Sequence, residues 1–237
     1  DMIFFADRAE VRFDTRMDWQ DDHRFLKTAF DTSIFTDYAR FEVQFGNVKR
    51  PTARNTTVEQ AKFEVLNHKY TDLSESRYGA ALLNDCKYGI SVEGGQMRLS
   101  LHKGGCRPDY KGDHGVHDCV YAFLPHQGAF DVNHVVKPAY QLNYPPVLAG
   151  KAFTALPLAL PEAENILVET IKPCEDEARA FIVRLYEAEG AFTNTPVRFF
   201  AGAKSAAICN MLEEPQEGLE DLAKVSLCFH PFEIKTL

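Results

Sequence analysis

The sequence has no apolar run near the ~20 residues that a helix needs to cross a bilayer, so it predicts no transmembrane helix. It also lacks a basic excess, with 26 Lys and Arg against 34 Asp and Glu and a formal net charge of −8. Nucleic acids and anionic membranes bind basic surfaces, so we expect neither as a partner. The opening residues DMIFFADRAEVRF lack the basic start, apolar stretch and cleavage site of a secretory signal. They alternate like a strand and begin without Met, so we expect a piece of a longer protein.

Short signatures of known chemistry are missing as well. The six cysteines form no CxxC pair, which favours reduced, buried thiols and a cytoplasmic protein over a disulfide framework. No nucleophile elbow, phosphate-binding glycine loop or Walker signature occurs, and there is no internal repeat. Composition and short motifs therefore indicate a soluble protein without naming a reaction.

Alternation of apolar and polar residues is what the sequence has in abundance. In ARFEVQFGNV, for example, Phe41 and Val43 alternate with Arg40 and Glu42, and GISVEGGQMRLSL predicts a hairpin that turns at Gly94–Gly95. The same pattern continues in CVYAFLPH, NILVETI, AFIVRLYEA, VRFFAG and VSLCFHPFEIKTL. Many short strands with Gly, Pro, Asn and Asp between them predict an all-β fold of the sandwich or barrel type.

Helix signals are few, and a proline-rich segment divides the chain. The best helix candidates are ESRYGAALL (75–83) and NMLEEPQEGLEDLAK (210–224), which Pro215 and Gly218 interrupt. Residues 138–161 hold five of the twelve prolines, and proline donates no ladder hydrogen bond. We therefore expect a large β-domain over 1–148, a connector over 149–159 and a smaller β-domain over 160–237.

Metal and acid–base chemistry have weak candidates. Cys106, His114, His117 and Cys119 are possible zinc ligands, but their spacing matches no structural zinc template, so we predict no metal site. Acidic pairs such as Asp21–Asp22 are expected to be solvated, because a chain with 34 acids contains such pairs by chance. No catalytic residue is predicted in this chain.

One polar cluster is harder to interpret. Asn84-Asp85-Cys86-Lys87-Tyr88-Gly89 follows the apolar run Ala80–Leu83. Asn and Asp at strand ends commonly bond to their own backbone, which makes this a turn. A polar cluster that ends a buried strand also often lies at the rim of a site. The residues alone leave both interpretations open.

A resemblance to a known family, over a much longer stretch of sequence, includes this polar cluster. The run FEVQFGNVKRPTARNTTVEQAKFEVLNHKYTDLSESRYGAALLNDCKYG (41–89) closely resembles the C-terminal β-region of glycoside hydrolase family 38 α-mannosidases of the cytosolic and bacterial branch. Further similar stretches are DW…DDHRFLKTAF, PDYKGDHGVHDCVYAFLPHQG, VETIKP…IVRLYEAEG, NMLEEP and PFEIKTL. The resemblance runs in order through nearly the whole chain.

The resemblance implies a large, mutarotase-like β-sandwich (a supersandwich) followed by a smaller β-sandwich. It implies a parent enzyme that hydrolyses terminal α-linked mannose with retention, with nucleophile and zinc ligands on an absent N-terminal domain. No cofactor is expected in this piece, which should be inactive alone. The implied partners are the catalytic domain of the same enzyme and a mannose-containing oligosaccharide, and a homo-oligomer stays open. Two alternatives from other classes are a free-standing carbohydrate-binding sandwich and an oligomerisation module.

Matching the family's motifs residue by residue gives candidates for the cleft rim or the domain interface. They are Asn84, Asp85, Lys87 and Tyr88 from NDCKYG, Asp113, Gly115 and His117 from D-x-G-x-H, and Arg50, Thr52 and Asn55 from RPT-x-x-N. A purely structural role in locking loops together is the alternative for each. The sequence departs from the family where Val116 takes the place expected for an arginine that approaches the sugar, with His114 or Arg107 as substitutes.

Overall fold

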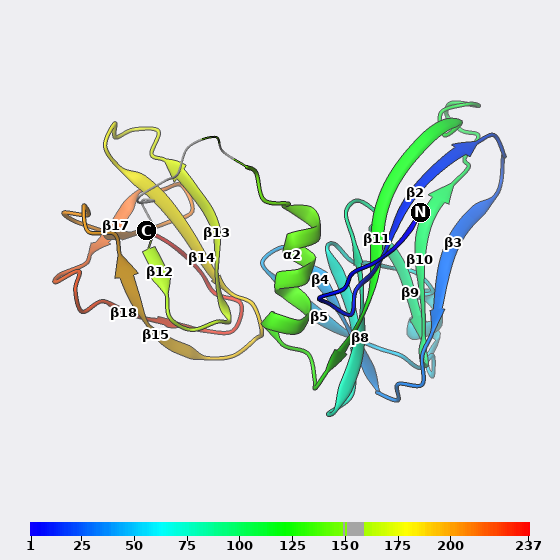
Figure 1. Cartoon of the computed structure of the whole chain (residues 1–237), viewed down its shortest axis with the longest axis horizontal. Coiled ribbons are helices and arrows are strands. Elements are labelled where there is room, and N and C mark those ends of the chain that lie inside the picture. Colours follow the sequence, from blue (N-terminus) through cyan, green and yellow to red (C-terminus); the bar gives the residue numbers. More distant parts are fainter. Residues whose placement is uncertain (149, 151–158) are drawn as a thin grey trace. The chain divides into compact units, whose positions relative to one another are not determined.

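The computed structural model describes residues 1–148, 150 and 159–237, and these residues form two compact units, 1–146 and 147–237. We call them unit 1 and unit 2. Both are built from antiparallel strands, so the predicted all-β class is confirmed (Figure 1). The predicted connector, 149–159, lies almost entirely outside the described residues. None of the helices in the described ranges is long and apolar enough to span a membrane.

Unit 1 contains two sheets. The larger has the order β1-β2-β11-β8-β7-β4-β5 and the smaller the order β3-β10-β9-β6. The strands of the larger sheet are β1 (Met2–Phe4), β2 (Val11–Trp19), β11 (Gly115–Gln127), β8 (Tyr78–Asn84), β7 (Tyr70–Ser74), β4 (Tyr38–Val43) and β5 (Gly46–Pro51). Those of the smaller sheet are β3 (Phe25–Asp31), β10 (Gln96–Lys103), β9 (Gly89–Glu93) and β6 (Val65–Leu66). The predicted hairpin is confirmed as β9–β10, with Gly94 at φ +55° in its turn.

Both faces of the larger sheet are buried at its centre, around β7 and β8. Alternate residues of β8, Ala80 and Leu82, enter the core shared with the smaller sheet. Ala81 and Leu83 point to the opposite face and are also fully buried. That face is covered by a π-helical turn, η1 (Val132–Val136), and by α2 (Lys137–Asn143), which Figure 1 shows against the sheet. Unit 1 therefore has three layers.

Three features of unit 1 differ from the sequence prediction. The segment 75–83 is not a helix, because it supplies the central strand β8, where a Cβ on Gly79 would lie 2.6 Å from the His126 ring. Glu42 is not on a solvated face but is buried against Lys69, since η1 and α2 cover that side of the sheet. Short helices were missed, including α1 (Thr57–Ala61), whose N-cap Thr56 forms a capping box with Glu59.

Unit 2 is a smaller sandwich. A three-stranded sheet, β12-β15-β18, faces a five-stranded sheet, β13-β14-β19-β16-β17, across an apolar core. The strands are β12 (Ala159–Pro161), β13 (Ile166–Pro173), β14 (Phe181–Glu187), β15 (Thr193–Phe199), β16 (Ala207–Cys209), β17 (Pro215–Gly218), β18 (Ser226–Phe229) and β19 (Ile234–Thr236). The helix candidate 210–224 is wrong: Pro215 and Gly218, the residues that interrupt the pattern, bound β17 and turns flank it.

The cysteines follow the prediction in part. All six are free thiols, and Cys119 is buried in the core of unit 1. Cys86 and Cys228 are exposed, so the expectation that all six are buried is wrong. Cys228 lies on the solvent side of β18, where alternation places it outward, and Cys86 lies in the turn between β8 and β9.

Candidate functional site

The NDCKYG turn joins β8 to β9 and is held by its own side chains. Asn84 is fully buried; its Oδ1 accepts from the Lys87 N–H at 2.7 Å and its Nδ2 donates to the His68 carbonyl at 2.6 Å. The Asp85 N–H donates to the Val120 carbonyl, and its Oδ2 accepts from the Val120 N–H, both at 3.1 Å. Asn84 and Asp85 therefore hold the turn in place against His68 and Val120. These contacts are of the kind expected for residues that lock loops together.

The next residues of the turn are more accessible. The Cys86 residue is exposed, yet loss of solvation at its thiol and then the hydrogen bond with Asp85 raise its pKa to about 12. It is therefore a protonated thiol and a poor nucleophile at neutral pH. Tyr88 is 49% exposed, and its ring lies 4.9 Å from that of His68. Tyr88 is exposed and Lys87 partly exposed, so their polar side chains can reach a ligand or partner.

His117 of the D-x-G-x-H motif lies against His102 of β10, with the two imidazole rings tilted to each other. The His102 and His117 rings lie 4.1 Å apart, and the Nε2 atoms face the Asp113 carbonyl at 3.1 and 2.9 Å. A carbonyl oxygen only accepts, so both Nε2 atoms carry the proton. Loss of solvation, the neighbouring His117 and, to a smaller extent, the charge of Lys87 lower the pKa of His102, while Asp113 acts in the opposite direction. His102 is consequently a neutral imidazole at pH 7.

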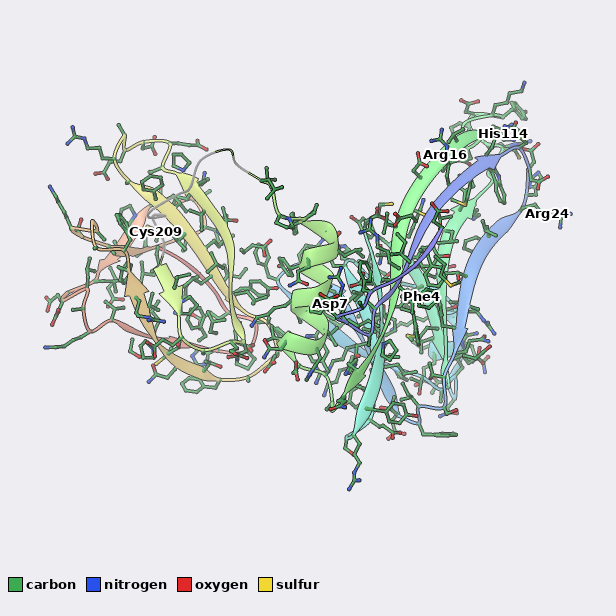
Figure 2. All side chains as sticks on the ribbon, viewed as in Figure 1. Phe4, Asp7, Arg16, Arg24, His114 and Cys209 are labelled. Carbon is green, nitrogen blue, oxygen red and sulfur yellow. The ribbon has the colours of Figure 1, made fainter. Side chains whose placement is uncertain are left out.

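These contacts bring two predicted motifs to the same end of unit 1. The charge of Lys87 acts on His102 and on Cys119, while the Asp113 carboxylate accepts from the Gly105 N–H at 2.7 Å. Gly115, at φ +122°, begins β11 in a conformation that favours glycine. Figure 2 shows His114 at this end of the unit. We call the group of Lys87, Tyr88, His102, Asp113 and His117 the polar end.

The residues considered as substitutes for a sugar-binding arginine differ in availability. Val116 is 52% exposed and offers no hydrogen bond from its side chain. His114 Nε2 lies 2.8 Å from the carboxylate of Asp22, which lies between β2 and β3. The imidazole of His114 is therefore already engaged. Arg107 is exposed in the same loop.

The third predicted motif lies elsewhere. The Arg50 Nη1 donates to the Leu66 carbonyl at 3.0 Å. Thr52 is buried, donates to the Thr36 carbonyl at 2.6 Å and accepts from Gly94 at the far end of β9. Asn55 is exposed at the start of the capping box, where its N–H donates to Glu59. Arg50, Thr52 and Asn55 therefore follow β5 toward α1, and do not join the polar end.

Sequence reasoning missed His102 and His68. Both belong to alternating segments in which a single histidine looks like an ordinary solvated residue. Their signal is position, because each lies within two residues of the end of a strand. Trp19, whose ring lies 4.9 Å from His102, was also missed as a neighbour of the loop.

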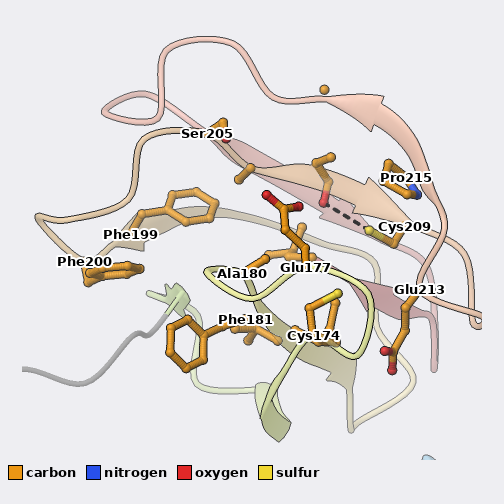
Figure 3. A pocket seen from close by; sticks show the side chains of 16 residues that line it. Cys174, Glu177, Ala180, Phe181, Phe199, Phe200, Ser205, Cys209, Glu213 and Pro215 are labelled. Carbon is orange, nitrogen blue, oxygen red and sulfur yellow. Dashed lines mark hydrogen bonds between the residues drawn. The ribbon is translucent and has the colours of Figure 1, made fainter.

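Unit 2 has a separate cavity of about 410 Å³ with an apolar lining. Figure 3 shows Phe181, Phe199 and Phe200 on one side and the thiols of Cys174 and Cys209 on another. Burial and the nearby Cys174 raise the pKa of the Cys209 thiol. Glu213, at the edge of the cavity, is occupied by Arg184 and Lys172. This lining offers few polar groups to orient a sugar.

Neither region contains an evident reaction centre. Within residues 1–148, 150 and 159–237, no three His, Cys, Asp or Glu side chains are arranged to hold a metal ion. The carboxylates of the polar end and of its loop are engaged with backbone N–H groups or with His114. The polar end offers hydrogen-bonding groups and aromatic surface, which suits contact with a hydroxyl-rich ligand or with another protein surface.

Comparisons with known proteins agree with a C-terminal region built from β-domains. Residues 2–111 match the description "Glycosyl hydrolases family 38 C-terminal domain", and residues 165–237 match "Glycosyl hydrolases family 38 C-terminal beta sandwich domain". The chain belongs to glycosyl hydrolase family 38, as part of its C-terminal region.

The similar proteins are much longer than this chain. Human "Alpha-mannosidase 2C1" is 38% identical over 96% of this chain and 23% of its own length. "Alpha-mannosidase G" of Dictyostelium discoideum is 38% identical over 99% of this chain and 22% of its own. The crystal structure of an alpha-mannosidase from Enterococcus faecalis V583 superposes with a TM-score of 0.81 at 17% identity, covering 99% of this chain and 28% of that one. The chain therefore spans about a quarter of the proteins it matches.

Proposed function

We propose that this chain is the non-catalytic C-terminal region of an α-mannosidase that removes terminal α-linked mannose with retention. The observation that carries the proposal is the pair of family matches, in order, over 2–111 and 165–237. The relatives named α-mannosidases align with this chain over about a quarter of their length, so the catalytic machinery falls to the rest of the enzyme.

In this proposal the polar end faces the catalytic domain or the rim of its cleft. Lys87 and Tyr88 project from a turn whose geometry Asn84 fixes, so their positions are defined before any ligand binds. The rings of His102 and His117, inclined to each other, offer aromatic surface beside sugar hydroxyls or an aromatic side chain, and the lowered pKa of His102 keeps that imidazole uncharged. The ligand would be a mannose-containing oligosaccharide.

Zinc, implied by the family resemblance, belongs in this proposal to the catalytic domain. The described side chains of this chain do not fit a zinc site, since they contain no suitable group of three ligands. A cytoplasmic setting is also part of the proposal, supported by six free thiols in the structure.

The first test is an assay of this chain alone on an aryl α-mannoside, with and without added zinc. We expect no turnover above the buffer blank. Zinc-dependent turnover by the isolated chain would contradict the proposal, because it would place the reaction centre here.

The second test uses the complete enzyme carrying Tyr88→Ala or Lys87→Gln, with Lys204→Gln in unit 2 as a matched charge control. We expect both variants to raise the KM for an oligosaccharide more than the KM for the aryl mannoside. The melting temperature of the enzyme should stay unchanged. Unchanged kinetics in both variants would remove the polar end from substrate binding and from the domain interface.

A further inference from the structure

A second cavity in unit 1, of about 300 Å³, has a basic lining. It lies between β5, α1 and the strands β6 and β9. The lining includes four cationic side chains, Lys49, Arg50, Arg54 and Lys62. Such a concentration is unexpected in a chain whose net charge is −8. Thr56 and Ser91 add hydroxyl groups.

The two carboxylates near this cavity, Glu59 and Glu93, offset only part of the charge of its four cations. Glu59 belongs to the lining, but its Oε2 accepts from the backbone N–H groups of Asn55 and Thr56 at 2.7 and 2.8 Å. Glu93 lies 3.5 Å from Arg54 and is half exposed, so solvent screens that pair. The cavity keeps a net positive charge.

Arg50 is the clearest sign of a missing counter-ion. Its guanidinium lies 4.7 Å from the centre of the Phe41 ring, and one nitrogen donates to the Leu66 carbonyl at 3.0 Å. Among the described residues, no carboxylate lies within ion-pair distance of it, and burial lowers the pKa of this guanidinium. A partly desolvated cation without a partner anion is costly, and a bound oxyanion would remove that cost.

We propose that this cavity binds a phosphate group through Arg50, with Arg54 and Lys62 at its rim. A guanidinium presents parallel N–H donors that match two oxygens of a phosphate, whereas a lysine supplies a point charge. The cavity would hold a phosphate monoester of a small molecule or inorganic phosphate. This site is separate from the polar end and goes beyond the proposed function.

The test is calorimetric titration of the 237-residue chain with inorganic phosphate and, in a second arm, with mannose 6-phosphate, at constant ionic strength. Unphosphorylated mannose and sodium chloride are the controls. We expect saturable binding of one phosphate per chain. Tighter binding of the sugar phosphate identifies a monoester ligand, whereas equal binding identifies the phosphate group itself.

The variants Arg50→Gln and Lys62→Gln locate the site. Gln at position 50 keeps a donor for the Leu66 carbonyl but loses the charge, and we expect binding about tenfold weaker or worse. Lys62 is exposed, so its replacement leaves folding intact and should weaken binding about two- to fivefold.

Lys204→Gln, which removes the same charge from unit 2, should bind like the unmodified chain. Absence of phosphate binding overturns the proposal. Binding that neither Arg50→Gln nor Lys62→Gln weakens overturns it as well, because the phosphate would then occupy another site.

Discussion

The two units bury polar side chains in different ways. Among the described residues, unit 1 buries a long series: Glu10, Glu42, Asn47, Thr52, Asn67, Thr71, Asp72, Asn84, Ser91 and His126. Unit 2 buries Glu187, Thr195 and Thr236. The cause is the number of layers. The central sheet of unit 1 is covered on both faces, so residues that alternation would send to solvent are enclosed and must find partners. A two-layer sandwich keeps one face of each sheet in water.

Asp72 and His126 form a buried pair of polar side chains in unit 1, for which we expect the largest effect on stability. The Asp72 Oδ1 lies 2.8 Å from His126 Nε2, and both side chains are at most 2% exposed. Removing one partner leaves the other charge buried, so Asp72→Ala should lower the free energy of unfolding by about 3–5 kcal/mol. Urea denaturation followed by fluorescence of Trp19, the only tryptophan, reports on unit 1.

The matched control is Asp118→Ala, because Asp118 also faces a cation but is 67% exposed. It should cost about 0–1 kcal/mol. Equal effects of the two variants would show that burial does not set the cost in unit 1.

Unit 2 offers one comparable group, Glu187, which is fully buried at the end of β14. Its carboxylate accepts from four backbone N–H groups, those of Glu189, Gly190, Ala191 and Phe232, at 2.7–3.0 Å. Glu187→Gln replaces an acceptor with a donor that faces these N–H groups. We expect a loss of about 2–3 kcal/mol.

Amide hydrogen exchange at residues 189–191, together with thermal melting, measures this loss. Glu177→Gln, at an exposed position, is the control and should leave both unchanged. Unchanged exchange in Glu187→Gln would mean that the turn holds without its carboxylate.

Alternation in the sequence predicts most strands of both units, because a sheet with a buried face imposes a period of two. It fails where both faces are buried: β8 is apolar at every position from Ala80 to Leu83, so periodicity cannot distinguish it from a helix. Glu42 was misplaced for the same reason, since its partner Lys69 belongs to a segment 27 residues away. Long-range pairing of this kind is not encoded in local pattern.

The candidate site was predictable in part. Motif matching brings NDCKYG and D-x-G-x-H to one end, and the structure places Lys87 near His102. Motif matching gives no sign that Arg50, Thr52 and Asn55 lie apart from these two motifs. The order of residues in the sequence does not report the direction in which β5 runs. The role of all ten residues at a cleft stays a prediction.

The His126–Asp72 pair also predicts a pH dependence confined to unit 1. Burial alone would lower the pKa of His126, but the hydrogen bond and charge of Asp72, with smaller effects of the Gln127 carbonyl and Asp131, raise it above its ordinary value. The group from η1 that stacks on it is His134, with ring centres 6.0 Å apart.

A histidine with a raised pKa stabilises the fold below its ordinary value near 6.5, and this contribution is lost as the pH rises through the folded pKa. Stability measured by Trp19 fluorescence should therefore fall as the pH rises above about 6.5. His126→Gln should flatten this fall. If stability fell more steeply with pH in His126→Gln than in the unmodified chain, the contribution of His126 would have the opposite sign. That result would contradict the ion pair.

The smallest effect concerns the two exposed cysteines, one in each unit. Cys86 and Cys228 are both exposed, yet the pKa of Cys86 is raised to about 12 by loss of solvation and by Asp85. The thiolate is the reactive form, and at pH 8 a thiol of this pKa is ionised only about once in ten thousand molecules. Iodoacetamide should therefore label Cys228 well before Cys86 in the folded chain, as peptide mass spectrometry would show. Asp85→Asn should speed the labelling of Cys86, because it removes the negative charge that disfavours the thiolate. In urea the two cysteines should react alike, and a difference that persisted there would trace to local sequence instead of the folded turn.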